Sequence, residues 1–273
     1  MNKQQLFRDP FAFIVIGVVG FILITVLGSL FENGPASTLQ SIENDYQAGE
    51  KAKSPVERKE AFNRSLEALL ILEEKYAPTY GNGMLYLNIG NNFFQLEDYP
   101  KAILYYNRAI ALRPRDTEAQ KLLSMAEAKL NISEIKNKSL FKKLFLMNGF
   151  LSLPERLQLF TLFGVLTLAA ASVYLWIKRQ WIYRAFVIAL ACSSLILLGL
   201  IADYYFSPLE GIMVRSSLLY RDAGEQYAKV VNDPLPSGQK VTVLTVSPSG
   251  KWLKIETSNG VVGYVPFESI EMI

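Results

Sequence analysis

Three long apolar runs, in which Asp203 is the single charged residue, constrain this chain more than any other feature. They span residues 11–31, 157–177 and 185–206. Each is long enough to cross the roughly 30 Å hydrocarbon core of a bilayer as a helix. Core helices of soluble proteins rarely extend so far without a charge. We therefore predict three transmembrane helices, and a buried core helix is the alternative for each run.

Basic residues beside these runs predict their orientation. Lys and Arg occur in the N-terminal segment 1–10 and again in the tight loop 178–184. The positive-inside rule places both in the cytoplasm, so the segments 33–155 and 207–273 are expected on the opposite side. Lysines before the second run argue against this orientation, but long segments cross the membrane largely regardless of charge.

The role of the first run is open between two interpretations. It exceeds the apolar core of about 7 to 15 residues that is usual in a signal peptide, and it has only a weak small-residue cleavage pattern. We favour a retained anchor over a cleaved signal peptide. Both interpretations leave the two large segments on the non-cytoplasmic side.

Residue usage excludes most classes of enzyme. The 273 residues contain no histidine and one cysteine, Cys192, which lies inside the third run. Triads of Ser, His and Asp, Cys-His pairs and His-containing metal motifs are therefore impossible. The net charge of +3 offers no strong basic field for nucleic acid. We expect no catalytic site, no metal and no cofactor.

Residues 84–116, MLYLNIGNNFFQLEDYPKAILYYNRAIALRPRD, are typical of two short amphipathic helices joined by a turn. Apolar side chains recur at helical spacing, and small residues stand where the two helices approach each other. The pattern resembles the 34-residue tetratricopeptide (TPR) repeat, with its best match over 83–116. The signature positions are filled by Tyr86, Gly90, Phe93, Ala102, Tyr106, Ala109 and Pro114.

One such repeat cannot bury its own apolar face, so neighbouring helices are expected. Upstream, helical patterns over 38–52 and 54–77 predict a degenerate repeat, and Pro78 follows the end of its second helix. Downstream, the pattern over 116–132 predicts a closing helix. Together they predict an all-α helical domain over 37–131.

In TPR folds the first helix of each repeat lines a groove, and the repeat register predicts which residues face it. They are Leu87, Asn88, Asn91, Phe94, Gln95, Lys121 and Met125. Asparagine amides and a lysine would bind the backbone of an extended peptide or its C-terminal carboxylate. The alternative is that Asn88 and Asn91 are only polar surface.

Between the helical domain and the second run, apolar residues and lysines alternate at helical spacing over 138–153. This pattern predicts an amphipathic helix in the membrane interface, with its lysines toward the headgroups. A further core helix is the alternative.

After Pro208 the pattern changes to short strands rich in Val, Ile, Tyr and Thr. Five are expected, over 212–222, 228–231, 240–247, 251–257 and 261–266. The order of these strands, with GYVP near the end, resembles bacterial SH3 (SH3b) domains and implies an all-β SH3-like barrel over 208–273. An aromatic surface for a peptide or cell-wall fragment would comprise Tyr220, Trp252 and Tyr264. The alternative is that these rings belong to the core.

The whole arrangement resembles the BatE-type proteins of bacterial aerotolerance operons. The resemblance rests on the N-terminal apolar run, the TPR tract over 85–120, the hairpin of two spans and the C-terminal SH3b pattern. It implies a multi-pass protein of the bacterial inner membrane, with both soluble domains in the periplasm. The implied partners are von Willebrand A-domain membrane proteins and a MoxR-type ATPase.

We therefore expect a non-enzymatic membrane scaffold that binds protein partners, within an envelope complex linked to stress or oxygen tolerance. The alternative is a cell-wall sensor, in which the SH3b domain binds peptidoglycan and the helical domain is a spacer.

Overall fold

The computed structural model describes residues 36–80, 83–132 and 151–273. The N-terminal segment 1–10, the first predicted span and nearly all of the predicted interfacial helix lie outside these ranges. The chain divides into two compact units, of which the first contains residues 153–202 and the second contains residues 38–152 and 203–273.

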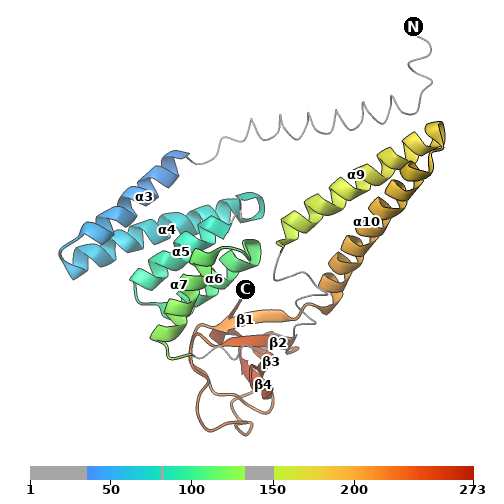
Figure 1. The fold of residues 1–273 in the computed structure, drawn as a ribbon. Helices are drawn as coiled ribbons and strands as arrows, with labels where there is room; N and C mark the ends of the chain where they lie inside the picture. Colours follow the sequence, from blue (N-terminus) through green and yellow to red (C-terminus); the bar gives the residue numbers. More distant parts are fainter. Residues whose placement is uncertain (1–35, 81–82, 133–150) are drawn as a thin grey trace. The chain divides into compact units, whose positions relative to one another are not determined.

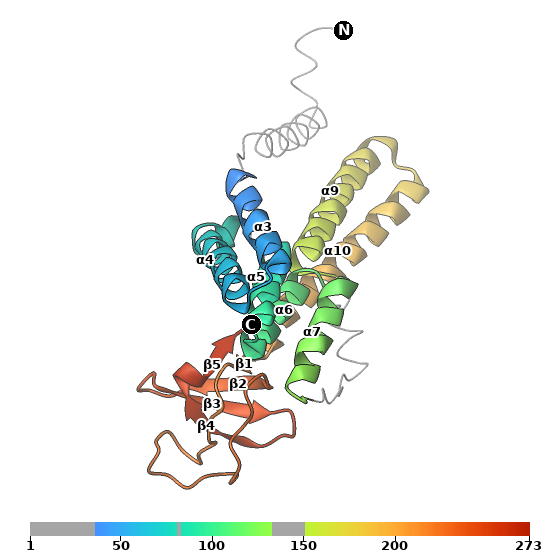
Figure 2. The same cartoon turned by 90° about the vertical axis from the view of Figure 1, so that its left-hand side faces the viewer.

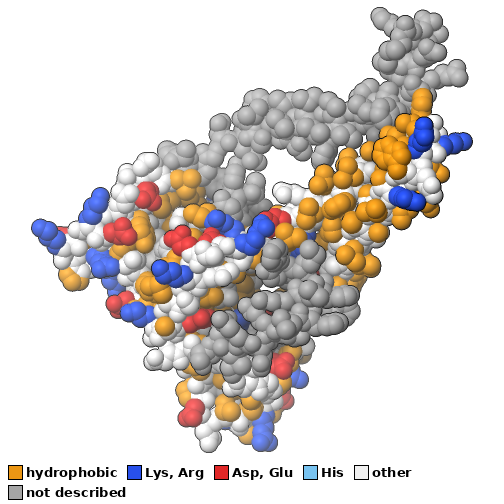
Figure 3. Space-filling view, viewed as in Figure 1, with side chains coloured by type: hydrophobic (Ala, Val, Ile, Leu, Met, Phe, Trp, Pro, Cys, Tyr) orange, Lys and Arg blue, Asp and Glu red, His pale blue; other side chains and the backbone are white. Residues whose placement is uncertain are grey.

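Two long apolar helices form an antiparallel hairpin (Figure 1). They are α9 (Leu153–Ile177) and α10 (Gln180–Phe206), and both are long and apolar enough to span a membrane. Few of their side chains are buried, and Figure 3 shows apolar side chains along both helices. Because α10 begins at Gln180, the connection is shorter than the predicted loop 178–184, and Lys178 turns the chain with a positive φ of 47°.

Among the residues that the structure describes, the helical part of the second unit contains five helices. They are α3 (Ala36–Lys51), α4 (Pro55–Tyr80), α5 (Gly83–Gln95), α6 (Tyr99–Leu112) and α7 (Thr117–Lys129). Figures 1 and 2 show them as a stack of antiparallel neighbours. The order is that of the predicted degenerate repeat, the well-formed repeat and the closing helix.

The repeat signature explains the contact between α5 and α6. Gly90 is small because a Cβ atom there would lie 2.7 Å from the ring of Tyr106. Both residues are buried, and Ala102 and Ala109 on α6 are almost fully buried as well. Close approach of the two helices therefore depends on glycine and alanine at these positions.

Aspartates begin the last two helices. The Asp98 carboxylate accepts a hydrogen bond from the backbone N–H of Lys101 at the start of α6. Asp116 accepts bonds from the N–H groups of Glu118 and Ala119 at the start of α7. Each side chain satisfies helix N–H groups that have no partner within the helix, so the sequence sets both helix starts locally.

The predicted end of the helix over 54–77, before Pro78, was wrong. Helix α4 continues to Tyr80, so Pro78 lies inside its last turn. Proline removes one backbone donor but keeps a φ compatible with a helix. It therefore did not end this helix.

The sheet of the second unit is antiparallel throughout. Its strands are β1 (Leu209–Met213), β2 (Lys240–Val246), β3 (Trp252–Thr257), β4 (Val262–Pro266) and β5 (Ile270–Met272). The order is β4-β3-β2-β1-β5. Since β4 and β5 are the two edges and do not pair with each other, the predicted closed barrel is not shown by this pairing.

Two of the predicted strands were misplaced. The sheet begins at Leu209, and the segment 214–239 contributes only isolated bridges, including Tyr220 with Lys229. The fifth strand is instead β5, which follows the short 3₁₀ helix Phe267–Ser269. Three residues after a helical turn are too few for an alternating pattern to be recognised.

The sheet has an apolar core of its own, and one of its strands also contributes to the core of the helices. Ile212 on β1 is fully buried in the cluster formed by α4, α5, α6 and α7, and Val214 and Ile273 pack against that cluster. A Cβ atom at Gly238 would lie within 3.1 Å of side chains of α6 and of the chain just after α7. The sheet therefore covers apolar surface that the repeat leaves exposed.

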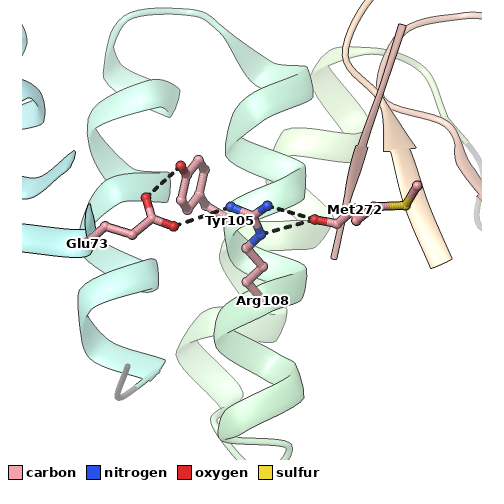
Figure 4. Close-up of polar contacts among 4 residues, drawn as sticks. All are labelled: Glu73, Tyr105, Arg108 and Met272. Carbon is pink, nitrogen blue, oxygen red and sulfur yellow. Dashed lines mark hydrogen bonds and ion pairs between the residues drawn. The ribbon is translucent and has the colours of Figure 1, made fainter. Parts of the chain in front are cut away.

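Hydrogen bonds and an ion pair also join the helices to the last strand of the sheet (Figure 4). The Arg108 guanidinium on α6 donates to the backbone carbonyl of Met272 at 2.7 and 3.2 Å. It also pairs with the Glu73 carboxylate on α4 at 3.4 Å, and the Tyr105 hydroxyl donates to that carboxylate at 2.9 Å. One arginine thus connects two helices to the last strand.

We expect Ile212→Ala to destabilise the helices as well as the sheet. Removal of a fully buried isoleucine should lower the free energy of unfolding by about 2–4 kcal/mol. Urea unfolding of the full chain in lipid nanodiscs, followed by far-UV circular dichroism, measures the effect. Leu244→Ala, an exposed change in β2, is the control and should change stability by less than about 0.5 kcal/mol. An unchanged helical transition for Ile212→Ala would show that the helices fold independently of the sheet.

Stability should also fall in alkaline solution. Burial raises the pKa of the Tyr106 hydroxyl, and it raises the pKa of Tyr105, which Glu73 raises further and Arg108 lowers. In the unfolded chain tyrosine ionises near pH 10, so above about pH 10 the unfolded state loses protons first and becomes favoured. Below about pH 10 this contribution to stability is fully present.

The change that tests this pH effect is Tyr106→Phe. The variant should lose less stability between about pH 9 and pH 11 than the parent chain does, as measured by urea unfolding at each pH. Tyr227→Phe, at an exposed position, is the control and should keep the parent's dependence. If the unfolding free energy of the parent and of both variants fell equally with pH, the attribution of this pH effect to Tyr106 would be wrong.

Candidate functional site

A cavity of about 280 Å³ opens between the first three helices of the helical domain. Helix α4 contributes Ser65 and Leu69, and α5 contributes Asn88, Asn91 and Asn92. The remaining lining residues belong to α3 and are Ile42, Glu43, Tyr46, Gln47, Glu50 and Lys51. We refer to this site as the α3–α5 pocket.

Helical periodicity places these residues together. Glu43, Gln47 and Glu50 stand at i, i+4 and i+7 of α3, and therefore on one face. The asparagines of α5 stand at i, i+3 and i+4, which is again one face. The pocket thus has a carboxylate-bearing wall opposite an amide-bearing wall.

Two polar groups in the wall have no hydrogen-bond partner among the described residues. They are Ser65 Oγ and Asn92 Oδ1, and the two residues are 0% and 1% exposed. The Asn92 Nδ2 group donates to the carbonyl of Asn88 at 2.9 Å, which fixes the amide and leaves Oδ1 as the unpaired atom. A buried unpaired acceptor costs about 1–3 kcal/mol, so each such atom calls for a structural or functional reason.

The repeat core holds a second amide in place, that of Asn91. The Tyr106 hydroxyl on α6 donates to Asn91 Oδ1 at 3.0 Å. Tyr106 is fully buried at a signature position of the repeat. The packing of α5 on α6 therefore positions a pocket side chain.

The electrostatic field of the pocket acts on Tyr46. Burial raises the pKa of its hydroxyl, and the carboxylates of Glu50 and Glu43 raise it further. A hydrogen bond with Gln95 and the charge of Arg58 lower it. The charged groups that line the pocket are two carboxylates and the ammonium of Lys51, so the lining has a net negative charge.

The seven groove residues expected from the repeat register do not lie together in one site. Asn88 and Asn91 line the pocket. Leu87 is instead 3% exposed in the helical core, and Phe94 packs its ring against Tyr99 at 5.4 Å. Leu87 therefore does not form the apolar floor, because α5 is covered by neighbours on its apolar side.

The other predicted groove residues lie elsewhere. Gln95 accepts a hydrogen bond from Arg58 Nη2 at 2.6 Å. Lys121 and Met125 are exposed on α7 and are not among the residues that line the pocket. The pocket therefore contains two of the predicted asparagines but not Lys121, which was expected beside them.

The sequence did not predict that Ser65 and Asn92 would line the pocket. Ser65 lies within the apolar stripe of α4, and Asn92 directly precedes the core residue Phe93. A polar residue within an apolar stripe is the sequence signal for such a position, since it must be buried with the stripe. The side chains that α3 adds carry no comparable local signal.

A second set of predicted residues comes together on the sheet. The rings of Tyr220 and Trp252 meet edge to face with their centroids 5.5 Å apart. Tyr220 pairs through its backbone with Tyr264, over which the Lys254 ammonium lies at 5.9 Å. All three aromatic residues are half-buried, so they are neither wholly core nor fully exposed. We call these three residues the aromatic face of the sheet.

Both sites present groups that could hydrogen-bond to a ligand or stack on it. The α3–α5 pocket offers amides, carboxylates and a hydroxyl, and the aromatic face offers rings and one lysine. Within the described residues, no group of three or more His, Cys, Asp or Glu side chains is arranged to hold a metal ion.

Comparison with known proteins identifies part of the helical domain. The Tetratricopeptide repeat family matches residues 84–116. This range covers nearly all of α5, the turn that follows it, the whole of α6 and the turn before α7. Comparisons with curated proteins and with solved structures found no match. The chain therefore contains one TPR repeat in a helical stack, and a repeat of this kind indicates protein–protein interaction.

Proposed function

We propose that this protein is a non-enzymatic membrane adaptor that binds a segment of a partner protein in the α3–α5 pocket. The observation that carries the proposal is the position of the pocket. It lies between the first helix of the detected TPR repeat and the two helices before it, and it contains two buried polar groups that have no partner among the described residues. An extended segment would supply those missing hydrogen bonds from its backbone or side chains.

The hairpin of α9 and α10 supports the membrane part of the proposal. Both helices are long and apolar enough to cross a bilayer, and Lys and Arg side chains gather at the turn between them (Figure 3). We propose that this turn is cytoplasmic, by the positive-inside rule, and that the helical domain and the sheet face the periplasm of a bacterial inner membrane.

The resemblance to BatE-type proteins supports a more specific setting. On that basis the adaptor would act in a Bat-type envelope complex linked to stress or oxygen tolerance. Its partners would be von Willebrand A-domain membrane proteins and a MoxR-type ATPase. The aromatic face of the sheet, in an SH3b-like domain, would be a second binding surface.

A second candidate function follows from that face. Half-buried rings of Tyr220 and Trp252 are suited to stacking on a sugar or a peptide, so the sheet would bind peptidoglycan and the helices would act as a spacer. Binding of the full chain to purified cell-wall sacculi that is lost in Trp252→Ala would favour this alternative.

Photo-crosslinking tests the adaptor proposal. A photoreactive amino acid at Gln47, exposed at the pocket, should give discrete protein adducts in intact cells. The same group at Glu67, exposed on α4 outside the lining, should give few. Asn88→Trp would place an indole in the pocket and should reduce recovery of the adducts at least about tenfold, since it blocks the site.

The matched control is Met84→Trp, at an exposed position one turn earlier on α5. It should leave adduct recovery unchanged, and both variants should keep the thermal unfolding of the parent. Equal adducts from the two crosslinking positions, or recovery that Asn88→Trp does not reduce, would refute binding in the pocket.

A further inference from the structure

The unpaired atoms of the α3–α5 pocket indicate what kind of group it receives. Asn92 Oδ1 is an acceptor that has no partner among the described residues, and the hydrogen bond from its own amide nitrogen to the carbonyl of Asn88 fixes this orientation. Asn91 Oδ1 is likewise occupied by the Tyr106 hydroxyl. Ser65 Oγ can accept or donate. The two buried, unpaired atoms of the pocket wall can therefore both accept a hydrogen bond from a ligand.

The charge of the opposite wall favours the same kind of ligand. Glu43 and Glu50 are both on the pocket face of α3, and their charges reach Tyr46, whose pKa they raise. Lys51 offsets one of the two charges. A carboxylate ligand could not donate to Asn92 Oδ1 and would meet net negative charge.

The apolar part of the lining suits a long aliphatic stem. Ile42 and Leu69 are 6% and 1% exposed and lie among the polar lining residues. Lysine buries such a stem along apolar surface and presents an ammonium with three donors. A water occupies about 30 Å³, so a cavity of about 280 Å³ has room for one long side chain.

We propose that the α3–α5 pocket binds a lysine side chain of an extended segment of the partner protein. The ammonium donates to Asn92 Oδ1 and Ser65 Oγ and lies near the carboxylates of α3. The pocket is thus selective for a basic side chain and not for the C-terminal carboxylate expected from the repeat register. This inference rests on the proposed function, because it specifies the segment that the pocket takes.

Titration with short peptides tests the selectivity. The probes are three fluorescent, capped peptides of Gly, Ser and Ala that differ only in a central lysine, norleucine or glutamate. The protein is the full chain in nanodiscs of neutral lipid, and anisotropy is read up to millimolar peptide. Since hydrogen bonds to a charged group contribute about 1.5–3 kcal/mol, the lysine peptide should bind at least about tenfold more tightly than the norleucine peptide. The glutamate peptide should bind most weakly.

Two variants show whether the named groups cause this preference. Ser65→Ala should abolish part of the lysine preference while leaving thermal stability equal or higher, since it removes a buried group that is unpaired in the free protein. A purely structural serine would give the opposite result, a loss of stability with no change in preference. Glu50→Gln should also reduce the preference. Glu67→Gln removes the same charge outside the pocket and should not.

Equal binding of the three peptides, tighter binding of the glutamate peptide, or no binding of any of them would overturn the lysine assignment. These results are separable from a failure of the proposed function. If crosslinks from Gln47 still depend on an open pocket, the adaptor function stands and only the selectivity is wrong. If those crosslinks are absent as well, both fail.

Discussion

The burial of helix α6 is the constraint on which the rest of this structure depends. Both sides of the helix are apolar, and its side chains from Ala102 to Tyr106 are almost fully buried. A single TPR repeat supplies only α5 as a neighbour, and isolated repeats of this kind are unstable. Here α7 and strand β1 of the sheet cover the remaining surface, with Ile212 in the shared core and Arg108 bound to the Met272 carbonyl. The sheet therefore serves as a structural neighbour of the repeat, whatever else it binds.

This burial also shapes the proposed binding site. Tyr106 is held in the core at the point where Gly90 allows the two helices to approach, and its hydroxyl orients Asn91 at the pocket. Within the described part of the chain, Ser65 Oγ and Asn92 Oδ1 have no hydrogen-bond partner on the wall beside it, at a cost to the free protein. A site built on a rigid core can keep such groups in place for a ligand, because neighbouring packing prevents their reorientation.

Local sequence signals were sufficient for the helices and insufficient for the pocket. The repeat signature and the caps at Asp98 and Asp116 act over a few residues, and these helices form where the pattern predicts. Tertiary packing decided the positions that the sequence did not reveal: Leu87 is in the core, and α3 supplies half of the pocket. In the sheet, the short β5 was not predicted and the strands predicted over 212–222 and 228–231 were misplaced, because strand pairing is decided by distant partners.

Hydrogen exchange of the protein in its native complex would test the central claim most directly. The chain purified from membranes with its partners can be compared with the same chain after the partners have been removed by high salt. If the partner segment lies in the α3–α5 pocket, backbone amides of 42–51 and 88–92 should exchange more slowly in the complex, while 252–266 on the sheet should be unchanged. Protection confined to 252–266 would contradict the account and would make the aromatic face of the sheet the binding surface.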